Sequence, residues 1–313
     1  MPSVSASPTR LKFWGTRGSI SVPGPHALRY GGNTTCVEVR ADGEVIVLDA
    51  GSGIRSLGNA LEKEFRSEPI KLSLLITHAH WDHIQGLPFF APAYEKKNEI
   101  HVRGYDGVDT TFEEIMAEPM KAPFFPIAMR ELSARIDIKK LTEMEFSVGN
   151  VRVCASFVNH PGVCAGYRLF TSAGSIAFLP DHEPYRFLHS AKGNAMSPEQ
   201  AKETAKEERI SLVEFLRGSD ILILDAQYTD GEYETHVGWG HGSVSGTVSL
   251  ALDAEVRRLL LFHHDPSHDD TMVDAMVNDA RRLIRESGKE LEVDGAREGE
   301  EILLRKDDTN SCK

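Results

Sequence analysis

The chain has 313 residues, of which 41% are hydrophobic, and it carries a formal net charge of −12 at pH 7. That length accommodates one large domain or two small ones, and the apolar fraction is sufficient for a sizeable core. The acidic charge disfavours nucleic acid as a partner, because nucleic-acid binding usually depends on Lys and Arg contacts to phosphates. A small, compact substrate fits this composition better.

Two further features bear on where the protein works. No run of about 18 apolar residues predicts a membrane-spanning helix, and the N-terminal MPSVSASPTR lacks the apolar segment of a secretory leader. The four cysteines, at positions 36, 154, 164 and 312, form no CxxC pair and no disulfide framework. Free thiols are typical of a reducing compartment, so we expect a cytoplasmic protein with no membrane partner.

Short runs rich in β-branched and aromatic residues recur along the chain and predict ten strands. In chain order these cover residues 11–14, 36–40, 44–49, 72–77, 99–104, 151–157, 166–170, 175–179, 221–225 and 258–264. Helices are predicted over 54–65 and 271–286, and the second has an apolar face that we expect in the core (Val273, Met276, Val277, Ala280 and Ile284). Many strands with few crossover helices indicate two packed sheets with helices outside, an α/β arrangement.

Four segments stand apart from this pattern. Residues 1–10 and 306–313 are polar, and we expect both to be flexible tails. Residues 105–146 and 186–212 are expected to be insertions, and the second is charged and helix-prone. The simplest interpretation of 186–212 is a solvated helix that covers one flank of a site. A lid, or a contact within a homodimer, remains the alternative.

The segment THAHWDH, residues 77–83, brings three histidines and an aspartate together at the end of a predicted strand. Loops at strand ends often collect polar side chains, but this density is improbable by chance in a chain with 13 histidines. Imidazole and carboxylate are ligands for zinc and related metals. His78 and His80 alternate along an extended turn and can face one side, whereas Asp82 and His83 begin a predicted helix and point to a second position. Two metals about 3.5–4 Å apart are an arrangement that activates a bridging water.

This segment matches the HxHxDH signature of the metallo-β-lactamase superfamily. The stretches GTRGSISVPGP, YGGNTTCVEV and VLDAGSGIRSLG resemble the opening of its phosphodiesterase branch, which includes RNase Z-like tRNA 3′-processing ribonucleases and phosphoribosyl cyclic phosphodiesterases. The resemblance implies a four-layer αββα sandwich, formed by residues 1–313 as a single domain, with the metals at one edge of the sheets.

The resemblance also supplies the remaining metal ligands. His160 occupies the position of the superfamily's third histidine, and Asp181 that of a carboxylate bridging both metals. The last ligand is His263, with its neighbour His264 as the alternative, because the two side chains point to opposite faces of an extended strand. The implied sets are His78, His80 and His160 on one metal, Asp82, His83 and His263 on the other, and Asp181 between them. Nitrogen and oxygen donors favour two Zn²⁺ ions, with Mn²⁺ or iron left open.

Catalysis is assigned to Asp82, Asp225 and His241. Asp225 ends a predicted strand, and His241 follows in the Gly-rich turn GWGHGSV. In the ribonuclease-like branch a histidine in this position contacts the phosphate or acts as general acid, and an acidic residue orients it; an ordinary turn histidine is the alternative. Arg17 and Asn33 are weaker candidates for contacts to an anionic substrate.

These features predict a hydrolase, most simply a phosphodiesterase that cleaves a small cyclic or nucleotide-like phosphodiester with a metal-bridging hydroxide. One alternative is a tRNA 3′-processing-type nuclease. The acidic charge disfavours it, as does the lack of a Gly/Pro-containing arm in the short interval between His160 and Asp181. A second alternative is a non-hydrolytic diiron sensor or signalling protein on the same fold.

Overall fold

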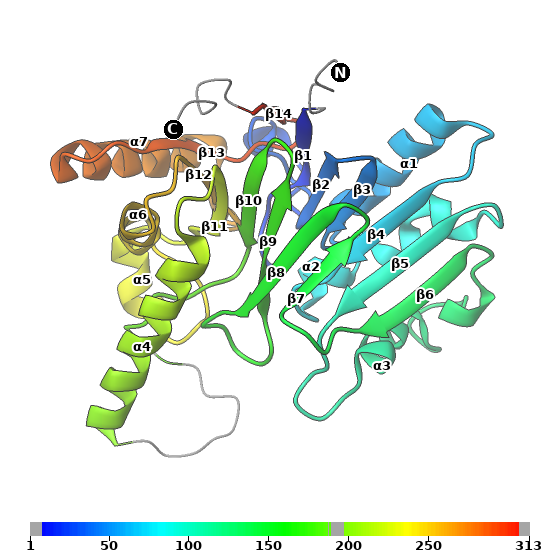
Figure 1. Cartoon of the computed structure of the whole chain (residues 1–313), viewed down its shortest axis with the longest axis horizontal. Coiled ribbons are helices and arrows are strands. Elements are labelled where there is room, and N and C mark those ends of the chain that lie inside the picture. The colour runs from blue at the N-terminus through cyan, green and yellow to red at the C-terminus, as the bar shows by residue number, and fades with distance from the viewer. Residues whose placement is uncertain (1–7, 187, 189–196, 307–313) are drawn as a thin grey trace, which may run out of the picture.

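Two β-sheets packed face to face form the centre of the molecule, and helices cover the outer face of each sheet (Figure 1). This computed structural model describes residues 8–186, 188 and 197–306. Each sheet has seven strands. The predicted αββα sandwich is therefore confirmed.

The first sheet has the strand order β14-β1-β2-β3-β4-β5-β6. The strands are β1 (Thr9–Gly15), β2 (Cys36–Ala41), β3 (Glu44–Leu48), β4 (Lys71–Leu75), β5 (Glu99–Gly104), β6 (Arg135–Lys140) and β14 (Glu301–Leu304). Strands β3 to β6 are parallel to one another, whereas β14, β1, β2 and β3 pair in antiparallel fashion.

The second sheet has the order β13-β12-β11-β10-β9-β8-β7. Its strands are β7 (Glu145–Val148), β8 (Val151–Phe157), β9 (Ala165–Thr171), β10 (Gly174–Leu179), β11 (Ile221–Asp225), β12 (Arg258–Phe262) and β13 (Glu292–Gly295). Strands β10 to β13 are parallel, and β7, β8, β9 and β10 are antiparallel neighbours.

Three clusters of buried apolar side chains join these layers. One lies between the sheets, one joins the first sheet to the helices on its outer face, and one joins the second sheet to α4, α6 and α7. The helices are α1 (Gly53–Phe65), α2 (Trp81–Ile84), α3 (Phe112–Ala117), α4 (Pro198–Leu216), α5 (Asp230–His236), α6 (Val244–Asp253) and α7 (Asp270–Ser287). The five apolar residues predicted on the buried face of α7 are all buried, as the 3.6-residue periodicity requires.

All ten predicted strands and both predicted helices are present, with differences elsewhere. Thr9 and Arg10, at the end of the tail expected over about residues 1–10, belong to β1, where they pair with β14. The helix predicted from Asp82 ends after one turn. The segment 105–146 contains β6 and part of β7, the outermost strands of the two sheets.

The described part of the segment 186–212 contains the beginning of α4. Ser197 and Gln200 form a capping box at the N-terminus of this helix. Residues 187 and 189–196 of that segment lie outside the described residues, as do 1–7 and 307–313. Cys36, Cys154 and Cys164 are free thiols, and Cys312 lies outside the described range. Among the described residues, no helix combines the length and apolar character that crossing a membrane requires.

Candidate metal centre

The candidate ligands all follow the carboxyl ends of strands. In the first sheet, β3 and β4 are parallel, so the residues after them emerge at one edge. In the second sheet, β8 runs antiparallel to β9 and β9 to β10, which makes β8 parallel to β10, β11 and β12. Such an edge is where α/β proteins commonly bind ligands. The sheet packing brings these two edges together.

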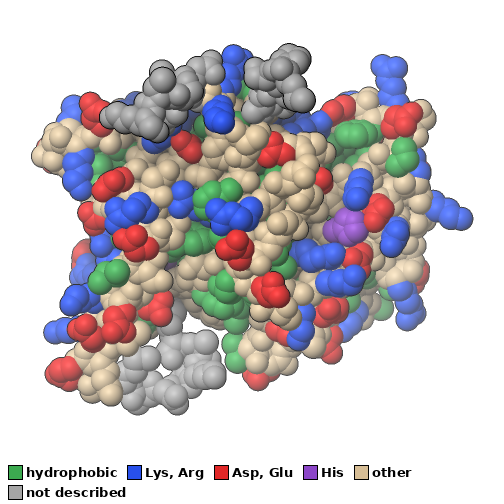
Figure 2. Space-filling model, in the orientation of Figure 1, with side chains coloured by type: hydrophobic (Ala, Val, Ile, Leu, Met, Phe, Trp, Pro, Cys, Tyr) green, Lys and Arg blue, Asp and Glu red, His purple; other side chains and the backbone are tan. Residues whose placement is uncertain are grey.

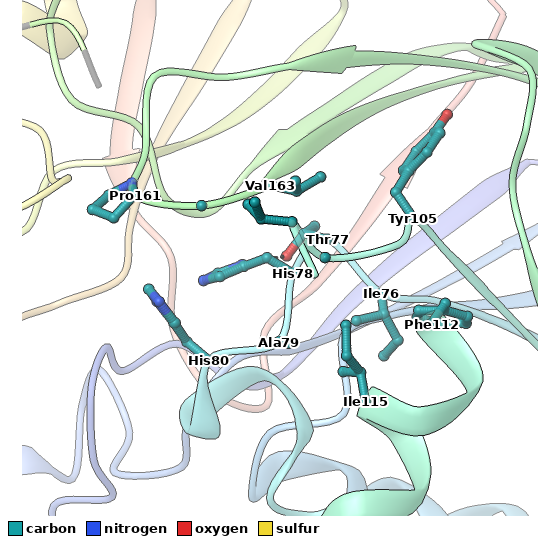
Figure 3. Close-up of a pocket in the computed structure, with 13 residues that line it drawn as sticks. Ile76, Thr77, His78, Ala79, His80, Tyr105, Phe112, Ile115, Pro161 and Val163 are labelled. Carbon is teal, nitrogen blue, oxygen red and sulfur yellow. Dashed lines mark hydrogen bonds between the residues drawn. The ribbon is translucent and has the colours of Figure 1, made fainter. Parts of the chain in front are cut away.

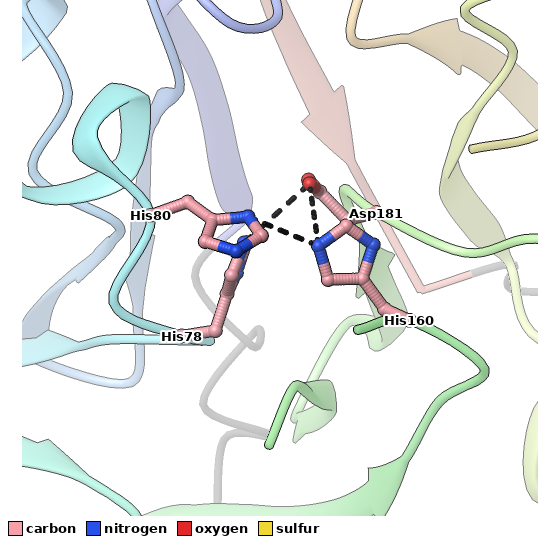
Figure 4. A group of neighbouring side chains, drawn as sticks. All are labelled: His78, His80, His160 and Asp181. Carbon is pink, nitrogen blue, oxygen red and sulfur yellow. Dashed lines mark hydrogen bonds and ion pairs between the residues drawn. The ribbon is translucent and has the colours of Figure 1, made fainter. Parts of the chain in front are cut away.

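The first cluster consists of His78, His80, His160 and Asp181, whose donor atoms all lie within 4.8 Å of one another (Figure 4). His80 Nδ1 is 3.1 Å from His160 Nε2. Asp181 Oδ2 lies 3.5 Å from both His78 Nε2 and His160 Nε2. The two sheets contribute jointly, because His78 and His80 follow β4 whereas His160 and Asp181 follow β8 and β10.

The second cluster consists of Asp82, His83 and His263. Asp82 Oδ2 is 3.2 Å from His83 Nε2 and 3.0 Å from His263 Nε2. The other oxygen of Asp181, Oδ1, faces this cluster at 3.1 Å from His83 Nε2 and 3.4 Å from His263 Nε2. Asp181 thus lies between the clusters and directs one oxygen to each.

The residues present fit metal ions. His78 Nε2, His83 Nε2 and Asp181 Oδ1 are buried and have no hydrogen-bond partner among the described residues, although buried polar atoms normally have one. Burial holds the pKa of His78 well below its ordinary value and lowers that of His160 to about 3. Both imidazoles therefore keep a free lone pair at neutral pH, as ligation requires.

A set of hydrogen bonds fixes which ring nitrogen each histidine directs into the centre. His83 Nδ1 donates to Asp49 Oδ2 over 2.8 Å, and His263 Nδ1 donates to Gln227 Oε1 over 3.0 Å. Each leaves its Nε2 as the ligating atom, the usual function of such partners around metal-binding histidines. Asp49 also accepts bonds from the Thr77 backbone nitrogen and hydroxyl, at 2.7 and 2.8 Å, which secures the start of the THAHWDH loop. Neither Asp49 nor Gln227 was predicted from the sequence.

Backbone from the N-terminal GTRGS turn packs directly on the second cluster. A Cβ at Gly18 would lie 2.3 Å from the His263 ring, so only glycine fits there. The Ser19 backbone nitrogen donates to Asp82 Oδ2 over 2.8 Å. This turn therefore holds two candidate ligands in place.

Glu183, another residue missed by the sequence analysis, organises the turn that carries His241. Its fully buried carboxylate accepts hydrogen bonds from Tyr233 Oη at 2.9 Å and from the backbone nitrogens of Gly238 and Gly240 at 2.7 and 2.9 Å. The Gly240 carbonyl in turn accepts from His160 Nδ1 over 2.7 Å. A Cβ at Gly240 would lie 2.6 Å from that nitrogen, so glycine permits this close approach. The turn at Gly238–Gly240 thus orients His160 and also positions His241, which follows it.

His241 and Asp225 form a hydrogen-bonded pair beside the two clusters. His241 Nδ1 donates to Asp225 Oδ2 over 2.9 Å, and its ring stacks on His263 with centroids 4.9 Å apart. Burial lowers the pKa of His241, but the adjacent Asp225 carboxylate outweighs it and the net effect raises the pKa to about 9. His241 also belongs to a group with Asp181 and His263 whose donor atoms lie within 4.8 Å.

Other sequence candidates lie apart from the clusters. His264 Nε2 donates to the Ala296 carbonyl over 2.9 Å, and its ring packs on Tyr30. Arg17 is fully buried and binds the carbonyls of residues 31, 265 and 268, so the expectation that it contacts a substrate is wrong. Asn33 is occupied by Glu298 and Ser52.

Comparisons with known proteins agree with this geometry. A family model described as "Beta-lactamase superfamily domain" matches residues 44–264. The curated "Ribonuclease Z" of Haloarcula marismortui is 23% identical over 294 residues, which cover 87% of this chain and 91% of that protein.

Solved structures share the fold. A diphosphatase from the PhnP family is similar with a TM-score of 0.60 and 18% identity, and 94% of this chain and 97% of that chain are covered. Unliganded yeast PDE1 is similar with a TM-score of 0.62 and 15% identity, with coverage of 96% and 100%. The His/Asp clusters provide the metal-binding side chains of a metal-dependent hydrolase. Since the family model spans more than half of the chain, the protein belongs to the metallo-β-lactamase superfamily, as a metal-dependent hydrolase.

Proposed function

We propose that the protein is a dinuclear metal-dependent phosphodiesterase that acts on a small cyclic or nucleotide-like phosphodiester. His78, His80 and His160 would hold one ion, Asp82, His83 and His263 the other, and Asp181 would bridge them. Zn²⁺ suits these nitrogen and oxygen donors, and Mn²⁺ or iron is compatible with them.

The observation that carries this proposal is the position of Asp181. Its two oxygens face two separate sets of imidazoles, at 3.5 Å on one side and 3.1–3.4 Å on the other. Two divalent ions in such a site supply an activated water near neutral pH and polarise a phosphoryl oxygen. The chain's own part is to hold the ligands in place through Asp49, Gln227 and the Gly240 carbonyl.

His241 is proposed as the general acid for the leaving oxygen. Because Asp225 accepts from its Nδ1, the ring is held in one orientation with Nε2 available to another partner. The ring contacts both His160 and His263, with centroids at 5.3 and 4.9 Å, so it borders both clusters. Asp225 also accepts from the backbone nitrogens of His182 and Gln227, which fixes the carboxylate itself.

A tRNA 3′-processing nuclease is the second candidate, favoured by the curated relatives named ribonuclease Z. Charge argues for the smaller substrate. The net charge is −12, and Figure 2 shows basic and acidic side chains interspersed over one face, without a broad basic region. Polyanion binding normally requires such a region.

The test uses two substrates that differ in leaving group. General acid catalysis typically contributes about 10²–10⁴-fold, and a nitrophenolate leaves with little help. His241→Ala should therefore lose most turnover of an alkyl phosphodiester but keep much of its activity on bis-nitrophenyl phosphate, with metal content unchanged. His236→Ala, which changes a histidine that stacks on Tyr228, is the matched control.

Equal losses on both substrates would reduce His241 to a binding contact. Failure of the fully metallated protein to hydrolyse any phosphodiester would refute the proposed activity and favour the diiron sensor. Cleavage of a tRNA precursor, but of no small diester, would favour the nuclease.

A further inference from the structure

A pocket of about 180 Å³ adjoins the first cluster on the side of His78 and His80 (Figure 3). Its floor and walls come from three parts of the chain. These are the start of the THAHWDH loop, the segment 105–115 with α3, and the turn 161–163 that follows His160. A group attached to a phosphate held at the first cluster would therefore enter this pocket.

The lining of the pocket is apolar. Ile115 and Phe112 from α3 and Val163 from the turn point into it, and no Lys, Arg, Asp or Glu is among the lining residues (Figure 3). Apart from the imidazoles of the cluster, the polar side chains of the wall are Thr77 and Tyr105, and both are already engaged. The Thr77 hydroxyl donates to Asp49 at 2.8 Å, and the Tyr105 hydroxyl donates to the Glu143 carbonyl at 2.9 Å.

Two backbone carbonyls of the wall are also engaged by the protein. The Ile76 carbonyl accepts from Tyr167 Oη at 2.7 Å, and the Thr77 carbonyl accepts from the Ala165 nitrogen at 3.0 Å. A nucleobase placed here would exchange water for side chains that are apolar or already hydrogen-bonded, which is unfavourable for its polar edge. An apolar group would lose nothing by the same transfer and would gain from leaving water.

We propose that this pocket binds a short alkyl or monocyclic aryl ester group of the phosphodiester. The size agrees, because an apolar cavity of about 150 Å³ holds benzene, so this pocket accommodates roughly six carbon atoms. The inference rests on the proposed function for the anchoring of the phosphate, and it narrows the substrate class to non-cyclic, nucleotide-like diesters in which the ester group on the His78 side is small and apolar.

The test measures binding of a homologous series of alkylphosphonates, from methyl to octyl, to the metal-loaded protein by calorimetry. A phosphonate has no hydrolysable ester bond, so the measurement does not depend on turnover. Burial of each methylene should tighten binding by about four-fold, and the gain should stop near six carbons when the pocket is full. A 2-methoxyethylphosphonate should bind more weakly than its butyl counterpart.

Two variants test whether the dependence of affinity on chain length arises in this pocket. Ile115→Trp should fill the pocket and abolish the dependence on chain length while methylphosphonate binding stays unchanged. Ile210→Trp, which changes an exposed isoleucine on α4 outside the pocket, is the matched control. If Ile115→Trp fails to fold, Val108→Asp places a charge at the exposed rim and should weaken hexylphosphonate binding at least ten-fold, with Ile210→Asp as its control.

An affinity that is independent of chain length in the wild type, or a gradient that survives in the pocket variants, would overturn the proposal. The proposed function fails separately. If the affinity of the wild-type protein rises with chain length but no phosphodiester is hydrolysed, the apolar binding pocket stands and the phosphodiesterase activity is rejected. If phosphodiesters are hydrolysed but the affinity does not depend on chain length, the phosphodiesterase stands and the pocket proposal is rejected.

Discussion

Replacing Glu183 with glutamine removes one acceptor oxygen from a buried carboxylate that accepts from Tyr233 Oη and from the backbone nitrogens of Gly238 and Gly240. If the remaining amide oxygen keeps Tyr233 and Gly238, the amide nitrogen faces the Gly240 N–H, which has then lost its partner. A hydrogen bond to a charged group contributes about 1.5–3 kcal/mol, and an unpaired buried donor costs about 1–3 kcal/mol. We therefore expect Glu183→Gln to lower the free energy of unfolding by roughly 3 kcal/mol.

The same change should weaken metal binding at the first cluster. The Gly240 carbonyl orients His160 through a 2.7 Å bond to Nδ1, and loss of such an outer partner typically costs about 10–100-fold in metal affinity. Binding to the second cluster, whose histidines depend on Asp49 and Gln227, should change little. Urea unfolding of the metal-free protein measures the first effect, and chelator competition at both sites measures the second.

Glu234→Gln is the matched control. Glu234 is an exposed residue of the neighbouring helix α5 and pairs with Arg186, and solvent screens such a pair, so its replacement should change the free energy of unfolding little. A folded Glu183→Gln protein that binds both ions with wild-type affinity would refute the inference that this carboxylate positions His160.

Three further predictions concern the centre. Asp181→Ala should lower the metal content at both positions below the expected total of about two ions per chain, because this one carboxylate faces both clusters. Loss of only one ion, measured by metal analysis, would contradict the bridging role. His263→Ala should empty or weaken the second position while His264→Ala leaves metal content nearly intact, and the opposite result would transfer the ligand role to His264. Burial lowers the pKa of His264 to about 3, so between pH 6.5 and 3 protons bind this residue only in the unfolded chain, and its contribution to stability is lost as pH falls. From pH 7.5 to 5.5 it should account for about 1.4 kcal/mol of the loss in unfolding free energy of the metal-free protein, so urea titrations of His264→Gln should find a loss smaller than that of the wild type by this amount.

The strands that the sequence did not predict share one property. β6, β7, β13 and β14 are the outermost strands of the two sheets. An edge strand pairs on one side only and is partly exposed, so it lacks the continuous apolar run that marks a buried strand. β6, for example, reads RIDIKK and has no fully buried residue. The ten central strands were predictable because they are richer in buried apolar residues, either along the whole strand, as in β11, or at alternate positions, as in β1.

The ligand set was predictable for a different reason. His78, His80, Asp82 and His83 lie within six residues, so a local motif reveals them. The residues that orient the ligands are distant from them in sequence, since Asp49 lies 34 residues from His83 and Gln227 lies 36 residues from His263. Those pairings depend on which strands lie side by side in each sheet, since β3 pairs with β4 and β11 with β12, and no local pattern encodes that order. Asp49 left the clearest signal, a carboxylate directly after a strand and before a glycine turn.

The division of the ligands between the sheets has a consequence for the lifetime of the protein. The first sheet supplies the THAHWDH loop and the second supplies His160, Asp181 and His263, so an ion held there fastens the two halves of the molecule at one edge. A ligand that binds only the folded state adds about 4.1 kcal/mol of stability at a thousand times its dissociation constant. Metal supply would thus set how often this edge opens to proteases. Chains that emerge during a shortage would be removed sooner, which couples the abundance of the enzyme to the availability of its ions.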